Sequence, residues 1–238
     1  MGDLRVGIVD VSSGESPVDR LTALCIGAET LSLAVGYLFL EGLAPLLPQL
    51  KKLSRIQLLI GNVVNRLTEE QIQEEQQLNR VGEPEEMFAR GLRDERDRAA
   101  LETALNLRRT IEAMPRTKEN RAVIIDVATL IAGGVMQVRL LTSRRLHAKA
   151  ACVSYPVNHE RFPGAAIIGS SNLTLAAGRR GKKEHGRWSA DLDVQVEGPE
   201  NLAFLNDWFD AHWSEAQDFQ KELFEELGQA WPLRTTVR

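Results

Sequence analysis

Short apolar segments that alternate with helical patterns recur along this chain. Residues 31–38 and 55–60 have the length and character of buried strands, and residues 42–52 between them have the spacing of an amphipathic helix. A strand, a helix and a strand in this order favour a parallel βαβ unit, and hence an α/β fold. Residues 1–17 are weakly patterned and are expected to be irregular. The same criteria predict strands at 136–141, 146–153, 165–168 and 190–196, and helices at 17–27, 120–132, 201–213 and 219–230.

A change of composition at residue 65 begins a segment, dense in Glu, Gln, Arg and Asp, that continues to residue 121. Gly82 and Pro84 would break a helix there, and Pro115 would end one. We predict an inserted helical hairpin within a single domain that covers residues 1–238 and closes with helices over 200–238. One interpretation of the insertion is a solvated helical lid. The alternative is a dimerisation or substrate-gating element.

The formal net charge of −4 argues against the overall basic character that many nucleic-acid-binding proteins have. Any phosphate-binding surface must therefore be local, and the most basic loop contains Arg179, Arg180, Lys182 and Lys183. The N-terminus lacks the features of a signal peptide, and the longest uncharged apolar run, 30–40, is too short to span a bilayer. We expect a soluble, cytoplasmic protein with no membrane partner. No metal-ligand cluster stands out in the sequence, so no cofactor is expected.

Two residues suited to binding an anion lie two positions apart on a predicted strand. These are His147 and Lys149, and the two-residue period of a strand puts both side chains on one face of the sheet. A lysine binds phosphate oxygens as a point charge, and a nearby cation favours a neutral, nucleophilic imidazole. Alone, such a triplet is more often a pair of surface or packing residues.

A polar loop follows the next predicted strand. It reads Gly169, Ser170, Ser171 and Asn172, and it can present hydroxyls, an amide and backbone N–H groups to a phosphate. Taken by itself, this loop is more often a turn or a helix N-cap.

Together the two motifs resemble the phospholipase D superfamily, whose signature is H-x-K followed by a G-S/G-x-N element. The family also carries an acidic residue on the next strand, a position that Asp191 takes here, and residues 31–61 look like the opening βαβ unit of that fold. The resemblance implies a mixed β-sheet flanked by helices on both faces. One departure is Ser154, which stands where the longer H-x-K-x4-D form of the motif has aspartate.

The resemblance also implies a mechanism that needs no metal. His147 would attack phosphorus and form a phosphohistidine, while Lys149, Ser170 and Asn172 would hold the non-bridging oxygens and Asp191 would orient a histidine. Further substrate contacts are expected from Ser171 and from the basic loop, through Arg179, Arg180, Lys182 and Lys183.

A second histidine is required to protonate the leaving oxygen. His159 and His185 stand in polar loops and His212 on a predicted helix, and none belongs to a second motif. The chain therefore carries one half-site, and a homodimer would bring two copies of His147 together.

Three functions compete. The first is a metal-independent nuclease that acts on DNA. The second is a catalytically weak or inactive DNA-binding or dimerisation module, which the loss of aspartate at Ser154 and the acidic net charge allow. The third is a lipid phosphodiesterase. The chain also resembles the N-terminal phospholipase D-like module of bacterial superfamily 2 helicases, some of them linked to defence, so a helicase domain is the expected continuation beyond residue 238.

Overall fold

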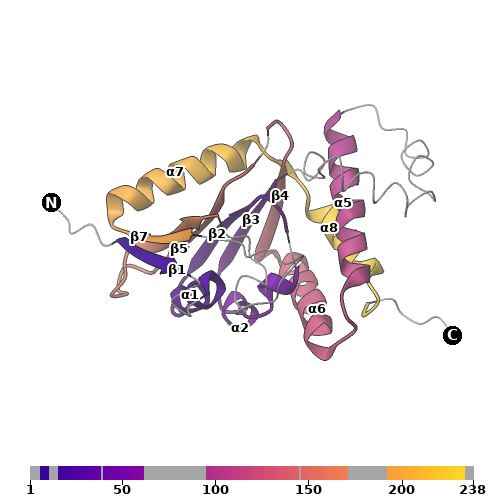
Figure 1. Cartoon of the computed structure of the whole chain (residues 1–238), viewed down its shortest axis with the longest axis horizontal. Coiled ribbons are helices and arrows are strands. Elements are labelled where there is room, and N and C mark those ends of the chain that lie inside the picture. The colour runs from indigo at the N-terminus through magenta and orange to yellow at the C-terminus, as the bar shows by residue number, and fades with distance from the viewer. Residues whose placement is uncertain are drawn as a thin grey trace.

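A computed structural model describes residues 6–10, 16–38, 40–61, 95–144, 146–170 and 192–233 of the chain. These residues form one mixed sheet of eight strands, in the order β1-β7-β6-β5-β2-β3-β4-β8 (Figure 1). In chain order the strands are β1 (Val6–Asp10), β2 (Thr30–Val35), β3 (Arg55–Gly61), β4 (Met136–Leu141), β5 (Lys149–Ser154), β6 (Gly164–Gly169), β7 (Leu192–Glu197) and the two-residue β8 (Gln217–Asp218).

The centre of the sheet is parallel and its two sides are antiparallel. Strand β2 pairs in parallel with β3, and β3 with β4, which confirms the predicted parallel pairing of the first two strands. Strand β5 runs antiparallel to β2, and β5, β6, β7 and β1 form an antiparallel series. Between β2 and β3 the chain forms only a 3-10 turn, Leu40–Leu43, and the four-residue helix α2, Leu47–Leu50. The longer helix expected over 42–52 is interrupted because Pro45 and Pro48 cannot donate backbone hydrogen bonds.

Strand β1 corrects the expectation of an irregular start. Residues Val6–Asp10 pair with β7 along its outer edge, from Val6 opposite Val196 to Asp10 opposite Leu192. Five residues that pair with a segment nearly two hundred positions away carry little local signal, because strand preference depends on the neighbouring strand.

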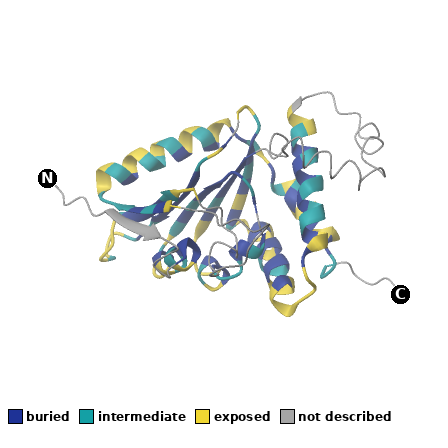
Figure 2. Ribbon diagram, in the orientation of Figure 1, coloured by how far each residue is buried: buried dark blue, intermediate teal, exposed yellow. Residues whose placement is uncertain are grey.

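Helices cover both faces of the sheet, as the resemblance implied (Figure 1). On one face, the long helix α7 (Pro199–Glu215) packs Phe209 and Trp213 against Ala34, Leu59 and Ala150. The opposite face forms the main core, shared by alternate strand residues and the remaining helices (Figure 2). Those helices are the short α2 and the longer α1 (Pro17–Leu24), α5 (Glu95–Ala113), α6 (Lys118–Ala132) and α8 (Gln220–Gln229).

The boundaries of α6 follow from its sequence. The side chain of Thr117 accepts a hydrogen bond from the backbone N–H of Asn120, and Gly133 ends the helix, followed by Gly134 with a φ of +70°. The helix predicted over 120–132 is therefore confirmed, with two further residues at its start.

Helix α5 belongs to the charged insertion, yet it is not a solvated lid. Ala100, Ala104, Leu107 and Ile111 are buried in the main core, and the helix ends two residues before Pro115. The rest of the insertion, with Gly82 and Pro84, lies outside the described residues.

An ion pair fastens α5 to α8. The guanidinium of Arg108 donates two hydrogen bonds to the carboxylate of Glu226, from Nε at 2.5 Å and from Nη2 at 2.8 Å. The Glu226 side chain is only 5% exposed, whereas that of Arg108 is 23% exposed. Removing the arginine would leave a buried carboxylate without this partner.

We therefore expect Arg108→Ala to lower the free energy of unfolding by about 2 kcal/mol, after allowance for the partial exposure of the arginine. Urea unfolding measures the loss, and Arg121→Ala on the exposed face of α6 is the matched control. Equal stability of the two variants would show that the pair contributes nothing.

Candidate active site

Three neighbouring strands place Lys149, Gly169 and Asp193 in one row across the sheet. Lys149 on β5 lies opposite Gly169 on β6, and Gly169 lies opposite Asp193 on β7. The three strands follow one another along the chain, and the register of their antiparallel pairing brings these residues together. Neighbouring strands are about 4.8 Å apart, so the row spans roughly 10 Å from the first backbone to the third.

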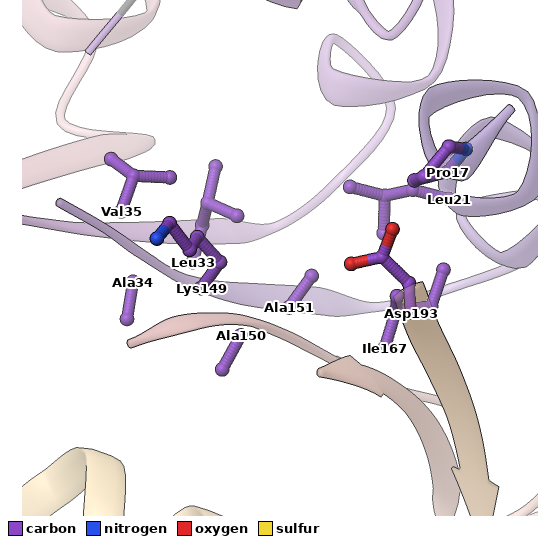
Figure 3. A pocket seen from close by; sticks show the side chains of 10 residues that line it. All are labelled: Pro17, Leu21, Leu33, Ala34, Val35, Lys149, Ala150, Ala151, Ile167 and Asp193. Carbon is purple, nitrogen blue, oxygen red and sulfur yellow. The ribbon is translucent and has the colours of Figure 1, made fainter. Parts of the chain in front are cut away.

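Lys149 and Asp193 are buried, at 9% and 2% exposed. Both line a small pocket between α1 and the sheet, and the other side chains that line it are apolar (Figure 3). In Figure 3 the amine of Lys149 extends beside Leu33 and Val35, and the carboxylate of Asp193 stands between Ile167 and the first turn of α1. Charged side chains are rarely this buried unless opposite charges or hydrogen bonds compensate them. The pocket therefore holds two charged side chains in surroundings that are otherwise apolar.

Gly169 provides the room that the Asp193 side chain needs. A Cβ atom at position 169 would overlap Oδ1 of Asp193 and the carbonyl oxygen of Leu192. The carboxylate thus leans over the glycine, from β7 toward β5. This close approach explains why the polar loop begins with glycine.

Ser170 is exposed and fastens the start of the polar loop to β7. Its Oγ accepts a hydrogen bond from the backbone N–H of Leu192 at 3.0 Å, and its own N–H donates to the carbonyl of Leu192 at 3.2 Å. These two bonds extend the β6–β7 ladder by one residue. They fix Ser170 at the same end of the sheet as Lys149.

His147 is exposed and precedes β5, which begins at Lys149 rather than at the expected residue 146. The alternation of side chains nevertheless continues through this segment. Leu146, Ala148 and Ala150 pack in the core beneath α7, whereas Ala151 belongs to the core on the α1 side. His147 and Lys149 therefore occupy alternate positions on the α1 side, the histidine at the surface and the lysine below it.

Two glycines support the backbone just before His147. A Cβ at Gly36 would lie 3.0 Å from the carbonyl oxygen of Leu146, and a Cβ at Gly61 would lie 3.1 Å from both that oxygen and Cβ of Leu146. Gly36 follows β2 and Gly61 ends β3, so the segment crosses the carboxyl ends of these parallel strands. That edge of an α/β sheet is where ligands generally bind.

Substitution of Gly61 by alanine is expected to cost about 1–3 kcal/mol of unfolding free energy, because the added methyl group would crowd the carbonyl oxygens of Gly36 and Leu146. Thermal unfolding checks this, with Gly228→Ala as the control, since a Cβ there meets nothing within 4 Å. An unchanged unfolding midpoint for Gly61→Ala would mean that the segment before His147 packs loosely over the ends of β2 and β3.

The loop before His147 is also tied to the end of α7. Arg144 pairs with Glu215 at 2.6 Å, and the hydroxyl of Ser143 donates a short hydrogen bond to the same carboxylate. The hydrogen bonds from Ser143 and then Arg144 lower the pKa of Glu215. The carboxylate of Glu215 therefore offsets part of the positive charge of Arg144 at this surface.

The structure resembles solved phospholipase D family structures. One is a phospholipase D family member, Nuc from Salmonella typhimurium, with a TM-score of 0.50 and 12% identity over 91% of this chain and 98% of that one. Another is phosphatidylserine synthase from Haemophilus influenzae Rd KW20, with a TM-score of 0.52 and 16% identity over 95% of this chain and 41% of the synthase. No protein-family model and no curated protein matches the sequence.

The chain has the phospholipase D-like fold. The fold implied by the paired motifs is thus confirmed. Within the described residues, this phospholipase D-like sheet brings Lys149 and the start of the polar loop into one row, with His147 at its surface edge.

The remaining residues assigned from the sequence lie outside the described part of the phospholipase D-like domain. Their roles stay predictions. They are Ser171, Asn172, Arg179, Arg180, Lys182, Lys183 and Asp191.

Two of the other histidines are at positions remote from Lys149. His159 stacks on Tyr155, with ring centroids 4.3 Å apart, beyond the far end of β5. His212 lies on α7, on the opposite face of the sheet, and its Nδ1 is 2.7 Å from the carbonyl oxygen of Trp208. Residue 185 lies outside the described residues. His159 and His212 therefore have packing roles and do not join His147.

Asp193 is the site residue that sequence reasoning missed. The acidic position of the motif was assigned to Asp191 alone, whereas Asp193 lies two positions later, on the buried face of β7. Gln195, the next residue on that face, binds Arg20 of α1 through its Oε1 at 2.5 Å. Polar residues at alternate positions facing the core were the signal that could have identified Asp193.

No helix in the described ranges is both long and apolar enough to cross a membrane. Among those residues, no three His, Cys, Asp or Glu side chains are grouped as metal ligands.

Proposed function

We propose that this chain is a metal-independent phosphodiesterase that cleaves DNA through a phosphohistidine at His147. The observation that carries the proposal is the pairing of an exposed histidine with a buried lysine at one end of a phospholipase D-like sheet. Lys149 of the H-x-K segment and Gly169 of the G-S-S-N element lie opposite each other on adjacent strands. An anion that reaches this edge would meet an imidazole, an ammonium and a polar loop.

The first step would transfer the phosphoryl group to the protein. A ring nitrogen of His147 attacks phosphorus, a P–N bond forms and the P–O bond to one sugar breaks, releasing one DNA end as the leaving group. Lys149 and Ser170, with Asn172, stabilise the negative charge that spreads over the non-bridging oxygens. In the second step, water attacks phosphorus, the P–N bond breaks and the second DNA end leaves with the phosphate.

The leaving oxygen requires a proton, and a second histidine would supply it and later accept one from water. His159 and His212 are fixed elsewhere. We therefore propose that a homodimer pairs two copies of His147, with Asp191 orienting one imidazole.

DNA is the substrate we favour because the basic loop with Arg179, Arg180, Lys182 and Lys183 follows the G-S-S-N element directly and can bind a phosphate backbone. The resemblance to helicase-associated modules further supports a place in a helicase or defence protein. Sequencing the native gene tests that context, because the proposal expects a helicase domain to be encoded in the same reading frame.

Ser154, where the motif departs from the family pattern, does not line the pocket that contains Lys149. Ser154 ends β5, five residues from Lys149, which corresponds to about 16 Å along a strand. A carboxylate there would not contact a phosphate bound beside Lys149. The loss of aspartate is thus compatible with activity.

Cleavage in excess EDTA is the test of this function. Plasmid and single-stranded DNA are incubated with the native protein or with His147→Ala, and the dimer content of each is measured. The proposal predicts cleavage that persists in EDTA and depends on His147. Binding without cleavage by a clean dimer would favour the DNA-binding or dimerisation module, and turnover of phosphatidyl lipid without DNA cleavage would favour a lipid phosphodiesterase.

A further inference from the structure

A second pocket lies beside the candidate site, and the proposed mechanism does not use it. We call it the α5 pocket, because the helix from the charged insertion forms one of its walls. Its buried floor is largely apolar and includes Leu107 of α5, Ile60 of β3 and Phe219. Its mouth is half-buried and includes Tyr37 and Asn106. A concave, mostly apolar surface with a few polar groups is typical of a ligand-binding site.

We propose that the α5 pocket is a subsite for an unpaired base of single-stranded DNA, next to the phosphate that His147 attacks. The base stacks on the ring of Tyr37, and the side-chain amide of Asn106 donates a hydrogen bond to an acceptor atom at the edge of the base. This inference rests on the proposed function, and it names the form of DNA that the site accepts.

The α5 pocket and the pocket of Lys149 lie on the same face of the sheet. Val35 on β2 lines the pocket of Lys149, and its partner on β3, Ile60, lines the α5 pocket. Both residues belong to the main core, and paired strands are about 4.8 Å apart. In Figure 3 the amine of Lys149 extends beside Val35, on the side of its pocket that is nearer to β3. A ligand that contacts the lysine is therefore close to the α5 pocket.

Tyr37 is also close to the backbone of the H-x-K segment. A Cβ atom at Gly36, the residue before it, would lie 3.0 Å from the carbonyl oxygen of Leu146. Successive Cα atoms are about 3.8 Å apart, so the Cα atom of Tyr37 lies within roughly 8 Å of that oxygen. His147 follows Leu146 directly. One nucleotide can therefore extend from a phosphate at His147 to a base at Tyr37.

The amide of Asn106 is oriented by its neighbour on α5. Its Oδ1 accepts a hydrogen bond from Nη1 of Arg109 at 3.3 Å, so the oxygen of the amide is the atom that faces the arginine. Within the described residues, its NH₂ group donates no hydrogen bond. The edges of all four bases present oxygen or nitrogen acceptors for such a donor.

The free volume of the α5 pocket is about 10 Å³, which is close to what one water molecule needs. A base is too large to enter it. The base therefore lies across the mouth, against Tyr37, as bases do on the aromatic side chains of proteins that bind single strands. A base inside a duplex is covered on both faces by its neighbours and must be unstacked before it reaches an aromatic side chain. The subsite consequently favours single-stranded DNA.

Binding by His147→Ala in EDTA separates contacts with the base from cleavage. The probes are a fluorescent oligothymidylate and an abasic sugar-phosphate oligomer of equal length, at one salt concentration. In this background we expect Tyr37→Leu to weaken binding of the oligothymidylate by about tenfold, the effect of losing one stacked base. Tyr37→Phe keeps the ring and should bind as the parent protein does. Binding of the abasic oligomer should not change with either variant. Phe204→Leu, at an exposed aromatic residue of α7, is the matched control.

Asn106→Ala tests the subsite independently of the ring, and it decides the matter if Tyr37→Leu fails to fold. We expect it to weaken oligothymidylate binding by about threefold to tenfold, the effect of losing one hydrogen bond, with no change for the abasic oligomer. Asn158→Ala, which is exposed in the loop between β5 and β6, is its control.

Equal losses of affinity for the two oligomers would overturn the inference, because the variants would then act on the backbone contacts or on the fold. Unchanged oligothymidylate binding by both Tyr37→Leu and Asn106→Ala would also overturn it. A failure of the proposed function is distinguishable from these results. A native chain that cleaves nothing in EDTA, while its variants lose affinity for the oligothymidylate alone, would keep the subsite and lose the phosphodiesterase.

Discussion

Replacement of His147 by alanine is expected to reduce EDTA-resistant cleavage by about 10⁴-fold or more, because loss of a nucleophile removes the covalent pathway altogether. His147 is exposed and precedes β5, so the substitution should leave the fold and the unfolding midpoint unchanged. The measurement is the single-turnover rate on plasmid and single-stranded DNA, with circular dichroism as the check on folding. Cleavage within tenfold of the native rate would exclude His147 as the nucleophile.

The same variant tests whether one active site needs His147 from both subunits of a dimer. A heterodimer of one native and one His147→Ala subunit, purified through two different tags, should be as inactive as the homodimeric variant, since each reaction needs both histidines. A heterodimer with half the native activity would mean that each subunit works independently. The acid would then have to come from the same chain as the nucleophile.

Lys149→Met is the prediction with the second-largest effect. We expect the rate to fall by about 10²- to 10³-fold, because the ammonium stabilises charge on the phosphoryl oxygens in the transition state. Lys149 is 9% exposed, and methionine can occupy its apolar surroundings without a charge. Lys118→Met at the exposed start of α6 is the matched control. If Lys149→Met retained the native rate, as the control should, then another residue would have to bind the phosphate.

Local sequence signals were sufficient for most of the sheet. Strand β4 was predicted with its bounds, Met136–Leu141, because its residues alternate and a glycine pair precedes it. Helix α6 was predicted from the apolar periodicity of residues 120–132 and from the glycine pair Gly133 and Gly134 that follows them. By contrast, β1 forms by pairing with β7, which local sequence does not predict. The helix between β2 and β3 is shortened by prolines, although the apolar pattern alone predicted a longer one.

The sequence predicts which residues belong to the candidate site, but it does not predict which of them are buried. The two motifs identified His147, Lys149 and Ser170, since each motif is local in the sequence. Burial is not local: Lys149 lies beneath α1, and Asp193 reaches the same pocket only through the β5–β6–β7 register. An aspartate in an alternating strand has the same sequence pattern whether it faces solvent or the core. Only the packing of α1 against that face distinguishes the two.

The most direct test of the central claim is detection of the covalent intermediate. Native protein is mixed with DNA in EDTA, quenched within one turnover under alkaline conditions that preserve phosphohistidine, and digested for peptide mass spectrometry. The account predicts a nucleotide or phosphoryl adduct on His147 that decays as product forms and is absent from His147→Ala. EDTA-resistant cleavage by the native protein with no adduct at any time, or with an adduct on another residue, would contradict it.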